Sequence, residues 1–261
     1  MHIGHLVTAL PSWALFGVIV VVCVIFSEIG AVIGIKRKTI KPNEPDNVIG
    51  AAVGAMLGLL AFMLGFTFSL TEARFGERKH LVIEQANAIG TCYLRAGLIP
   101  ETQKLAMRSY LKDYLEGLLK LNQQHDTTSI ARLEDIHLQM WQQATSLVNQ
   151  DMDTQIRALF ISSLNAVLDL AEEREIVALV FRIPDIFWVS LFLLSVFSMF
   201  SFGYQTGMSG MRRIVATPLL AGAFALVFMM IADMDSIDNR RFKISQKPLI
   251  DTLKMMKKNV P

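Results

Sequence analysis

The sequence predicts an all-α membrane protein with four transmembrane helices and a helical extramembrane domain inserted between the second and the third. Two features support this: four long, nearly uncharged apolar runs, and a helix-rich segment between the second run and the third. Of 261 residues, 52% are apolar and 18% are charged, whereas about 25% are charged in an average soluble chain. This composition excludes a disordered chain and a coiled-coil rod.

Each of the four apolar runs is long enough to cross a bilayer, because a spanning helix needs about 20 mostly apolar residues. The runs are Trp13–Ile35, Val48–Leu70, Ile186–Tyr204 and Ile214–Ala232. No Lys or Arg precedes the first run, and the run is longer than a signal-peptide core, so we expect a retained helix. It contains the one charge found in the four runs, Glu28, which should face protein or water or snorkel towards the interface.

The segment between the second and third runs has the composition of helices. The second membrane helix is expected to continue without a break to about Gly97, because the next helix breaker is Pro100. We expect further helices at 102–121, at 129–148 and, after an N-cap at Asp151, up to Arg182. The chain then divides into a first transmembrane hairpin, a helical extramembrane domain, a second transmembrane hairpin and a basic C-terminal tail, at 1–71, 72–182, 183–235 and 236–261.

Charge and motifs argue against several classes of protein. The formal net charge is only +2, without the basic excess of a nucleic-acid-binding protein. Cys23 and Cys92 cannot form a disulfide framework and are expected to be free thiols. No Walker loop, H-E-x-x-H or G-x-S-x-G motif is present, so we expect neither an enzyme nor a cofactor.

Two histidines have spacings found in metal sites. Glu134 and His137 form one E-x-x-H motif, but di-iron bundles need two copies and further carboxylates. An exposed polar helix face is favoured, and no metal is expected. His80 and Glu84 are expected to form an i,i+4 side-chain pair.

A stripe of small and aromatic residues follows one face of the second membrane helix. Gly50, Gly54 and Gly58 recur every four residues, and Phe62 and Phe66 continue the same stripe. One interpretation is a packing seam with aromatic core residues, because small residues let helices approach closely in lipid. The other is a pore-lining face whose rings form a hydrophobic constriction.

A polar stripe follows on the same helix after Arg74 and Arg78. Its members share one face at i, i+3, i+7 and i+11: Glu84, Asn87, Thr91 and Arg95. The opposite face is apolar and comprises Val82, Ala86, Ile89 and Tyr93. Candidate polar partners lie on the last extramembrane helix: Asn165, Asp169, Glu172, Glu173 and Arg174. These groups form either a structural salt-bridge network near the neck or part of an ion path.

Several of these segments together resemble a known family. The run Leu57–Ser69, then Arg74 and Arg78, then Glu84–Pro100, resembles the bacterial membrane family called bestrophin-like, of unassigned function. Further stretches agree: Ser163–Asp169 with Arg174, Arg182–Pro184, Phe202–Gly207, and Asp233-Met-Asp235 followed by Ile244–Leu249. The resemblance covers nearly the whole chain.

The sequence is more distantly similar to bestrophins, which are pentameric anion channels with a phenylalanine-lined neck followed by an Arg. Phe62-Met-Leu-Gly65-Phe66 with Arg74 is similar to that neck pattern. The resemblance implies Phe62 and Phe66 as neck residues, Gly58 at a wider level, small anions as the conducted ions and a homopentamer.

The terminal motif departs from the family pattern. Asp233 and Asp235 are present, but Ile237 stands where a proline is usual. The acidic calcium-binding cluster of animal bestrophins is not reproduced, so the resemblance does not extend to calcium gating.

The distribution of Lys and Arg does not decide the orientation. The loops 36–46 and 205–213 hold six basic residues, against seven in the tail, and the first helix alone favours an outside N-terminus. The resemblance favours both termini and the large domain on the cytoplasmic side of a bacterial inner membrane.

We therefore predict an oligomeric, passive anion channel in the lipid bilayer. An alternative is a non-conducting scaffold or sensor that binds a partner through residues 72–182. A transporter would need membrane helices broken near the midplane, for which Gly65 and Gly203 are the candidates.

Overall fold

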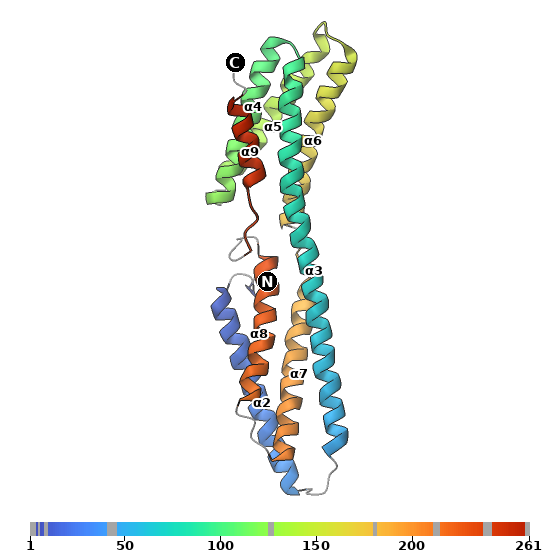
Figure 1. Cartoon of the computed structure of the whole chain (residues 1–261), viewed down its shortest axis with the longest axis vertical. Helices are drawn as coiled ribbons and strands as arrows, with labels where there is room; N and C mark the ends of the chain where they lie inside the picture. The colour runs from blue at the N-terminus through green and yellow to red at the C-terminus, as the bar shows by residue number, and fades with distance from the viewer. Residues whose placement is uncertain are drawn as a thin grey trace. The chain divides into compact units, whose positions relative to one another are not determined.

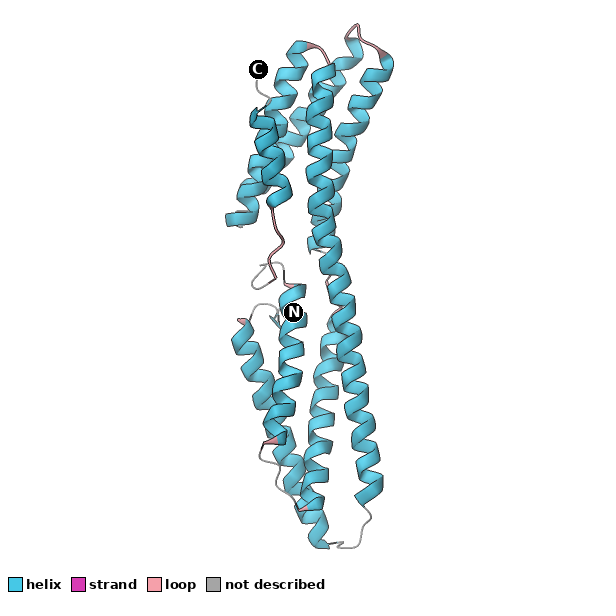
Figure 2. Ribbon diagram, in the orientation of Figure 1, coloured by secondary structure: helices cyan, strands magenta, loops and turns pink. Residues whose placement is uncertain are grey.

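The computed structural model describes residues 4, 6–7, 10–40, 46–124, 128–179, 182–210, 215–236 and 242–258. These residues form helices and loops, and none of them lies in a β-strand (Figure 2). The predicted all-α fold is therefore confirmed. The chain forms two compact units: a membrane unit of Met1–Phe75 and Arg182–Lys243, and a helical unit of Gly76–Phe181 and Ile244–Pro261.

Four helices in the described part of the chain are long and apolar enough to cross a membrane, in agreement with the four predicted runs. They are α2 (Ser12–Ile40), α3 (Asp46–Arg95), α7 (Asp185–Ser209) and α8 (Ala216–Asp235). Because hydrocarbon offers no hydrogen-bond partners, the backbone of a spanning segment must be satisfied within the helix. Hydroxyl groups follow the same rule: Thr67 and Ser195 donate to the carbonyl oxygens four residues earlier, at 2.8 Å in both cases.

The membrane unit is held together where α2 packs against α7 and α8 (Figure 1). At the α2–α7 contact the two backbones nearly touch, because both helices present glycine. A Cβ atom on Gly203 would overlap the carbonyl of Ser27, and one on Gly30 would overlap the carbonyl of Phe200. Gly34 and Gly207 are equally crowded, so the small residues form one continuous seam.

In its described residues, the helical unit combines the C-terminal part of α3 with four further helices and two single 3₁₀ turns, η1 (Ala96–Leu98) and η2 (Leu147–Asn149). The helices are α4 (Glu101–Gln124), α5 (Thr128–Ser146), α6 (Thr154–Leu179) and α9 (Lys247–Lys258). Its core contains fully buried side chains from each of α3 to α6, including Ile89, Leu111, Met140, Phe160 and Leu164. As predicted, α3 ends shortly before Pro100.

The predicted N-cap of α6 is wrong by two residues. Asp153, and not Asp151, accepts hydrogen bonds from the N–H groups of Gln155 at 2.7 Å and Ile156 at 3.2 Å. This is the geometry of an N-cap side chain, which satisfies donors in the first turn. Both aspartates precede the helix, and only the local backbone decides which of them reaches those N–H groups.

The C-terminal segment, predicted from the sequence only as a basic tail, contains the helix α9. Leu249 and Met256 of α9 are fully buried in the core of the helical unit. The Tyr93 hydroxyl donates to the carbonyl of Met256 at 3.2 Å, and Lys257 pairs with Glu116 at 3.0 Å. The hydrogen bond from Lys257 holds the pKa of Glu116 below its ordinary value. The seven-residue spacing of Leu249 and Met256 was the available sequence signal for this face.

The glycine seam generates a stability prediction. Gly203→Ala should destabilise the solubilised protein by about 1–3 kcal/mol, because its methyl group would force the α2 and α7 backbones apart. Gly222→Ala on α8 is the matched control, since an added Cβ there meets nothing within 4 Å. Thermal unfolding in detergent measures both variants, and equal melting temperatures would contradict the seam.

Candidate functional site

The predicted neck residues of α3 are not part of the core of a single chain. Phe62 is 66% exposed, Phe66 is 50% exposed, and Gly58 is also exposed. A Cβ atom added to Gly54 or Gly58 would meet nothing within 4 Å. Within one chain, the part of the stripe from Gly54 to Phe66 is therefore not a packing seam with a buried aromatic core, whereas a Cβ atom on Gly50 would lie 3.0 Å from Nε2 of Gln205 on α7. The tight glycine contact occurs instead between α2 and α7.

The exposed rings form a short aromatic row within the membrane unit. The ring centroids of Phe62 and Phe66 are 6.5 Å apart with an angle of 18° between the planes. Phe66 lies 6.4 Å from Phe187 of α7, with the planes at 25°. These separations lie within the range of interacting aromatic pairs. The sequence did not single out Phe187, because its proximity depends on how α7 packs beside α3.

Arg74 follows the aromatic row on α3 and carries an N–H group that is suited to donate a hydrogen bond to an anion. Its Nη1 atom is shielded from solvent and has no hydrogen-bond acceptor among the described residues. A shielded guanidinium N–H without an acceptor is costly, and charge-assisted hydrogen bonds to anions are strong. Arg74 therefore keeps a donor that a small anion could use.

The polar and apolar faces predicted for the C-terminal part of α3 are present. Val82, Ala86, Ile89 and Tyr93 are buried, whereas Asn87 and Thr91 are exposed. Glu84 lies 3.3 Å from His80, as the predicted i,i+4 pair. Nη1 of Arg95 donates to the carbonyl of Leu159 at 3.0 Å. Arg78 is partly buried within this segment.

One predicted member of the polar network on α6 turns into the core. Nη1 of Arg174 donates to Oε1 of Gln85 at 2.5 Å, and Nε2 of Gln85 donates to the Tyr114 hydroxyl at 3.1 Å. Burial lowers the pKa of the Arg174 guanidinium and raises the pKa of the Tyr114 hydroxyl. Gln85 and Tyr114 were not predicted, although Gln85 lies on the buried side of α3.

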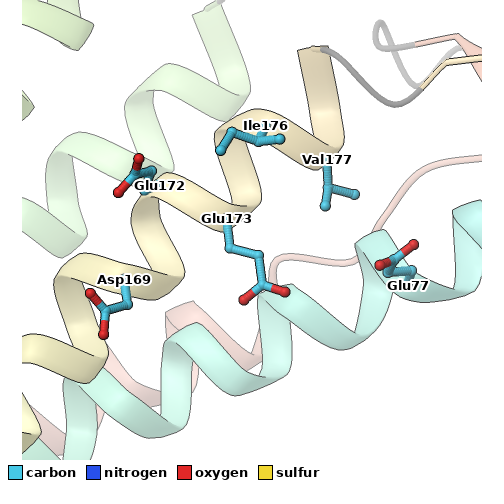
Figure 3. Close-up of a pocket in the computed structure, with 6 residues that line it drawn as sticks. All are labelled: Glu77, Asp169, Glu172, Glu173, Ile176 and Val177. Carbon is cyan, nitrogen blue, oxygen red and sulfur yellow. The ribbon is translucent and has the colours of Figure 1, made fainter.

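The other predicted partners on α6 are exposed, and all of them except Asn165 are acidic. Asn165 and Asp169 face outward, and Asp169 lines a pocket of about 410 Å³ in the helical unit. Its lining includes four carboxylates, from Glu77 of α3 and from Asp169, Glu172 and Glu173 of α6 (Figure 3). No group of three or more His, Cys, Asp or Glu side chains in the described part of the chain has the geometry to hold a metal ion. The pocket is therefore an acidic surface without a metal-binding arrangement.

The acidic pair of the terminal motif is buried and structural in its contacts. The Ser12 hydroxyl donates to Oδ1 of Asp233 at 2.5 Å, and the Ile183 N–H donates to Oδ1 of Asp235 at 3.1 Å. Nε of Arg182 lies 3.9 Å from Oδ2 of Asp235. The pair thus joins the end of α8 to the start of α2 and to the segment before α7. Ile237 lies outside the described residues.

Both cysteines are free, as predicted. Cys23 is buried in the membrane unit and Cys92 is buried in the core of the helical unit. Neither is placed to act as an exposed nucleophile.

The comparison with known proteins identifies the family. The sequence profile of the Bestrophin-like domain matches residues 17–249, so the chain belongs to the Bestrophin-like family. No curated protein sequence matches the chain.

Solved structures share the fold. A crystal structure of a bacterial bestrophin homologue from Klebsiella pneumoniae is 16% identical, with a TM-score of 0.60 over 94% of this chain and 98% of that chain. Another structure of that homologue, with a different substitution, is 15% identical, with a TM-score of 0.59 over 95% and 97% of the two chains. At these identities the likeness establishes the fold alone.

The buried hydrogen bonds of Gln85 make its substitution a test of the helical unit. Gln85→Leu should lower the free energy of unfolding by about 1–3 kcal/mol, because the Arg174 guanidinium and the Tyr114 hydroxyl each lose a buried partner. Asn87→Leu, at an exposed position of the same helix, should change it by less than about 0.5 kcal/mol. Chemical denaturation in detergent measures the free energy of unfolding of both variants. An equally small change in the two would show that the hydrogen bonds of Gln85 do not stabilise the helical unit.

Proposed function

We propose that this member of the Bestrophin-like family is an oligomeric ion channel that conducts small ions passively. The α3 helices of several copies surround one axis, with Phe62 and Phe66 at the constriction and Gly58 at a wider level. The observation that supports this most is the exposure of Phe62 and Phe66 in a single chain, next to glycines that contact nothing. By resemblance to bestrophins, the assembly is a homopentamer.

The chemistry of the stripe suits a gated constriction. Rings of Phe side chains around an axis make a narrow apolar zone that water leaves readily, and such zones can gate by dewetting. The edge of a Phe ring carries partial positive charge, which favours an anion over a cation in a dry neck. The solvent-shielded Nη1–H group of Arg74, which also lies in the membrane unit, likewise favours an anion over a cation. Small anions are therefore the first candidates, as the resemblance implies.

A second candidate is the conduction of cations. The pocket lined by Glu77, Asp169, Glu172 and Glu173 is negatively charged, and a field of that sign concentrates cations and repels anions. If the ion path passes this surface, selectivity depends on whether the apolar neck or the acidic surface dominates.

The proposed location is a bacterial inner membrane, with the helical unit and both termini on the cytoplasmic side. The four membrane-spanning candidates support an integral membrane protein. The sidedness rests on the resemblance to bestrophins and not on the count of basic residues.

Ion flux from proteoliposomes tests the proposed neck. Phe62→Ala and Phe66→Ala should each raise halide efflux, on the order of tenfold for every ~1.4 kcal/mol by which the barrier falls. Phe197→Ala is the matched control, because Phe197 is a ring on α7 outside the α3 stripe and is 50% exposed, as Phe66 is. Sodium efflux from the same vesicles distinguishes the cation candidate.

Two outcomes would contradict the proposal. One is the absence of flux of either ion from folded, reconstituted wild-type protein and from both variants. The other is an equal rise in the Phe197→Ala control, which would indicate a general leak. In the first case a partner of residues 72–182 becomes the better explanation.

A further inference from the structure

The helical unit carries an acidic surface where α6 lies beside α3. Its pocket of about 410 Å³ is lined by Ile176, Val177 and four carboxylates: Glu77, Asp169, Glu172 and Glu173 (Figure 3). All four acidic residues are exposed, and none of them forms an ion pair with a described residue. Ile176 is 39% exposed at the same surface. The negative charge here is therefore not balanced by neighbouring residues of the same chain that the structure describes.

A basic surface covers the side of the same unit where α9 packs against α4. Five lysines lie on it in exposed or partly exposed positions: Lys112 and Lys120 of α4, and Lys254, Lys257 and Lys258 of α9. Three carboxylates accompany them: Asp113, Glu116 and Asp251. Lys257 pairs with Glu116 at 3.0 Å, and Lys254 pairs with Asp251 at 3.4 Å. The lysines therefore outnumber the acidic groups, and the surface is positively charged.

The pKa of Glu116 shows that lysines of both helices act at one place. The hydrogen bond from Lys257 lowers this pKa most, and the charges of Lys112 and Lys120 lower it further. Ile250 lies on the same face of α9 as Lys254 and Lys257, four and seven residues before them, and is 38% exposed. The basic surface thus combines positive charge with one exposed apolar side chain, as the acidic surface combines negative charge with Ile176.

The two surfaces lie at the same level of the helical unit but on different sides of it. Arg174 of α6 and Tyr114 of α4 both point inward to one side chain, Gln85 of α3. Glu172 and Lys112 each precede one of these inward residues by two positions. In an α-helix this turns them by about 200°, to the outside of α6 and of α4. In the view of Figure 1, α9 and α6 lie on either side of α3.

We infer that the acidic surface of one copy contacts the basic surface of the next copy, so that neighbouring helical units are joined head to tail. The inference rests on the proposed oligomeric channel and assigns the surfaces through which its subunits recognise each other. A head-to-tail contact uses two different surfaces and forms a ring when the rotation closes. Two surfaces at one level, on different sides of the unit, can meet by rotation about a single axis.

Charge complementarity favours a second copy of this chain as the partner. The acidic surface is hollowed, and the long stems of lysine side chains can carry their ammonium groups into such a pocket. Exposed ion pairs are individually weak and are screened by salt, so several must act together. Contact between Ile250 and Ile176 would remove apolar surface from water as well. A contact of this kind fixes which surfaces meet and in which orientation, more than how tightly they bind.

The same contact bears on the choice of the conducted ion. Carboxylates that pair with lysines of the next copy do not line the ion path and do not attract cations to it. The head-to-tail contact therefore favours the anion candidate over the cation candidate.

Carbodiimide coupling of the full-length protein in proteoliposomes tests the contact, because this reagent joins a carboxylate to a lysine amine only where the two touch. The wild type should give linked dimers on a denaturing gel, and mass spectrometry should find α6 carboxylates joined to lysines of α4 or α9. Glu172→Lys with Glu173→Lys should lower the yield of linked dimers about tenfold, since like charges then face each other. Glu134→Lys with Asp135→Lys is the matched control, because it changes two adjacent exposed carboxylates of α5 and should leave the yield unchanged.

An exchange of charge separates lost recognition from disturbed folding. Adding Lys254→Glu and Lys258→Glu to Glu172→Lys and Glu173→Lys reverses both surfaces in each chain and should restore the dimer yield towards that of the wild type. The inference is overturned if a wild type that light scattering shows to be oligomeric gives no such linkage. It is also overturned if the exchange restores nothing, or if the α5 control falls equally. These results leave the proposed channel standing when halide flux persists, whereas a wild type that stays a single chain contradicts both.

Discussion

The membrane unit depends on one contact, the glycine seam between α2 and α7. At Gly30, Gly34, Gly203 and Gly207 each backbone occupies the space that a side chain would need on the other helix. No hydrophobic force drives helices together in lipid, so this close packing has to provide much of the attraction. Because α2 also packs against α8, it joins three of the four spans. One side of α3, with Gly58, Phe62 and Phe66, is exposed.

The small and aromatic residues of α3 are exposed, whereas the glycines of the α2–α7 seam are tightly packed, so the two sets serve different purposes. Gly54 and Gly58 have no neighbour within reach, and Phe62 and Phe66 place half or more of their surfaces outside the chain. A stripe that changes from tiny side chains to rings along one helix presents a face of graded width. Repeated around an axis, such a face would narrow from the level of Gly58 to that of the two rings.

The positions of the helices could be predicted from the sequence, but the contacts between the helices could not. Hydropathy located all four spans, and helical periodicity placed Val82, Ala86, Ile89 and Tyr93 on a buried face. Small residues at helical spacing, however, occur both in the α2–α7 seam and on open α3, and a one-dimensional pattern cannot distinguish these uses. The buried chain from Arg174 through Gln85 to Tyr114 joins three helices, so no local spacing could have revealed it. The proposed roles of the neck residues remain predictions.

The most direct test of an ion path lined by the α3 helices of several copies is the reaction of Phe62→Cys in proteoliposomes with a charged, water-soluble thiol reagent. The rate of this reaction is the quantity measured. Only a thiol in contact with water ionises and reacts quickly, and the native Cys23 and Cys92 are buried and give a low background. The proposed channel predicts fast modification at position 62, with altered flux, and slow modification of Phe197→Cys on the exposed surface of α7. Equal, slow reaction at both positions would place Phe62 against lipid or a packed surface and contradict the channel.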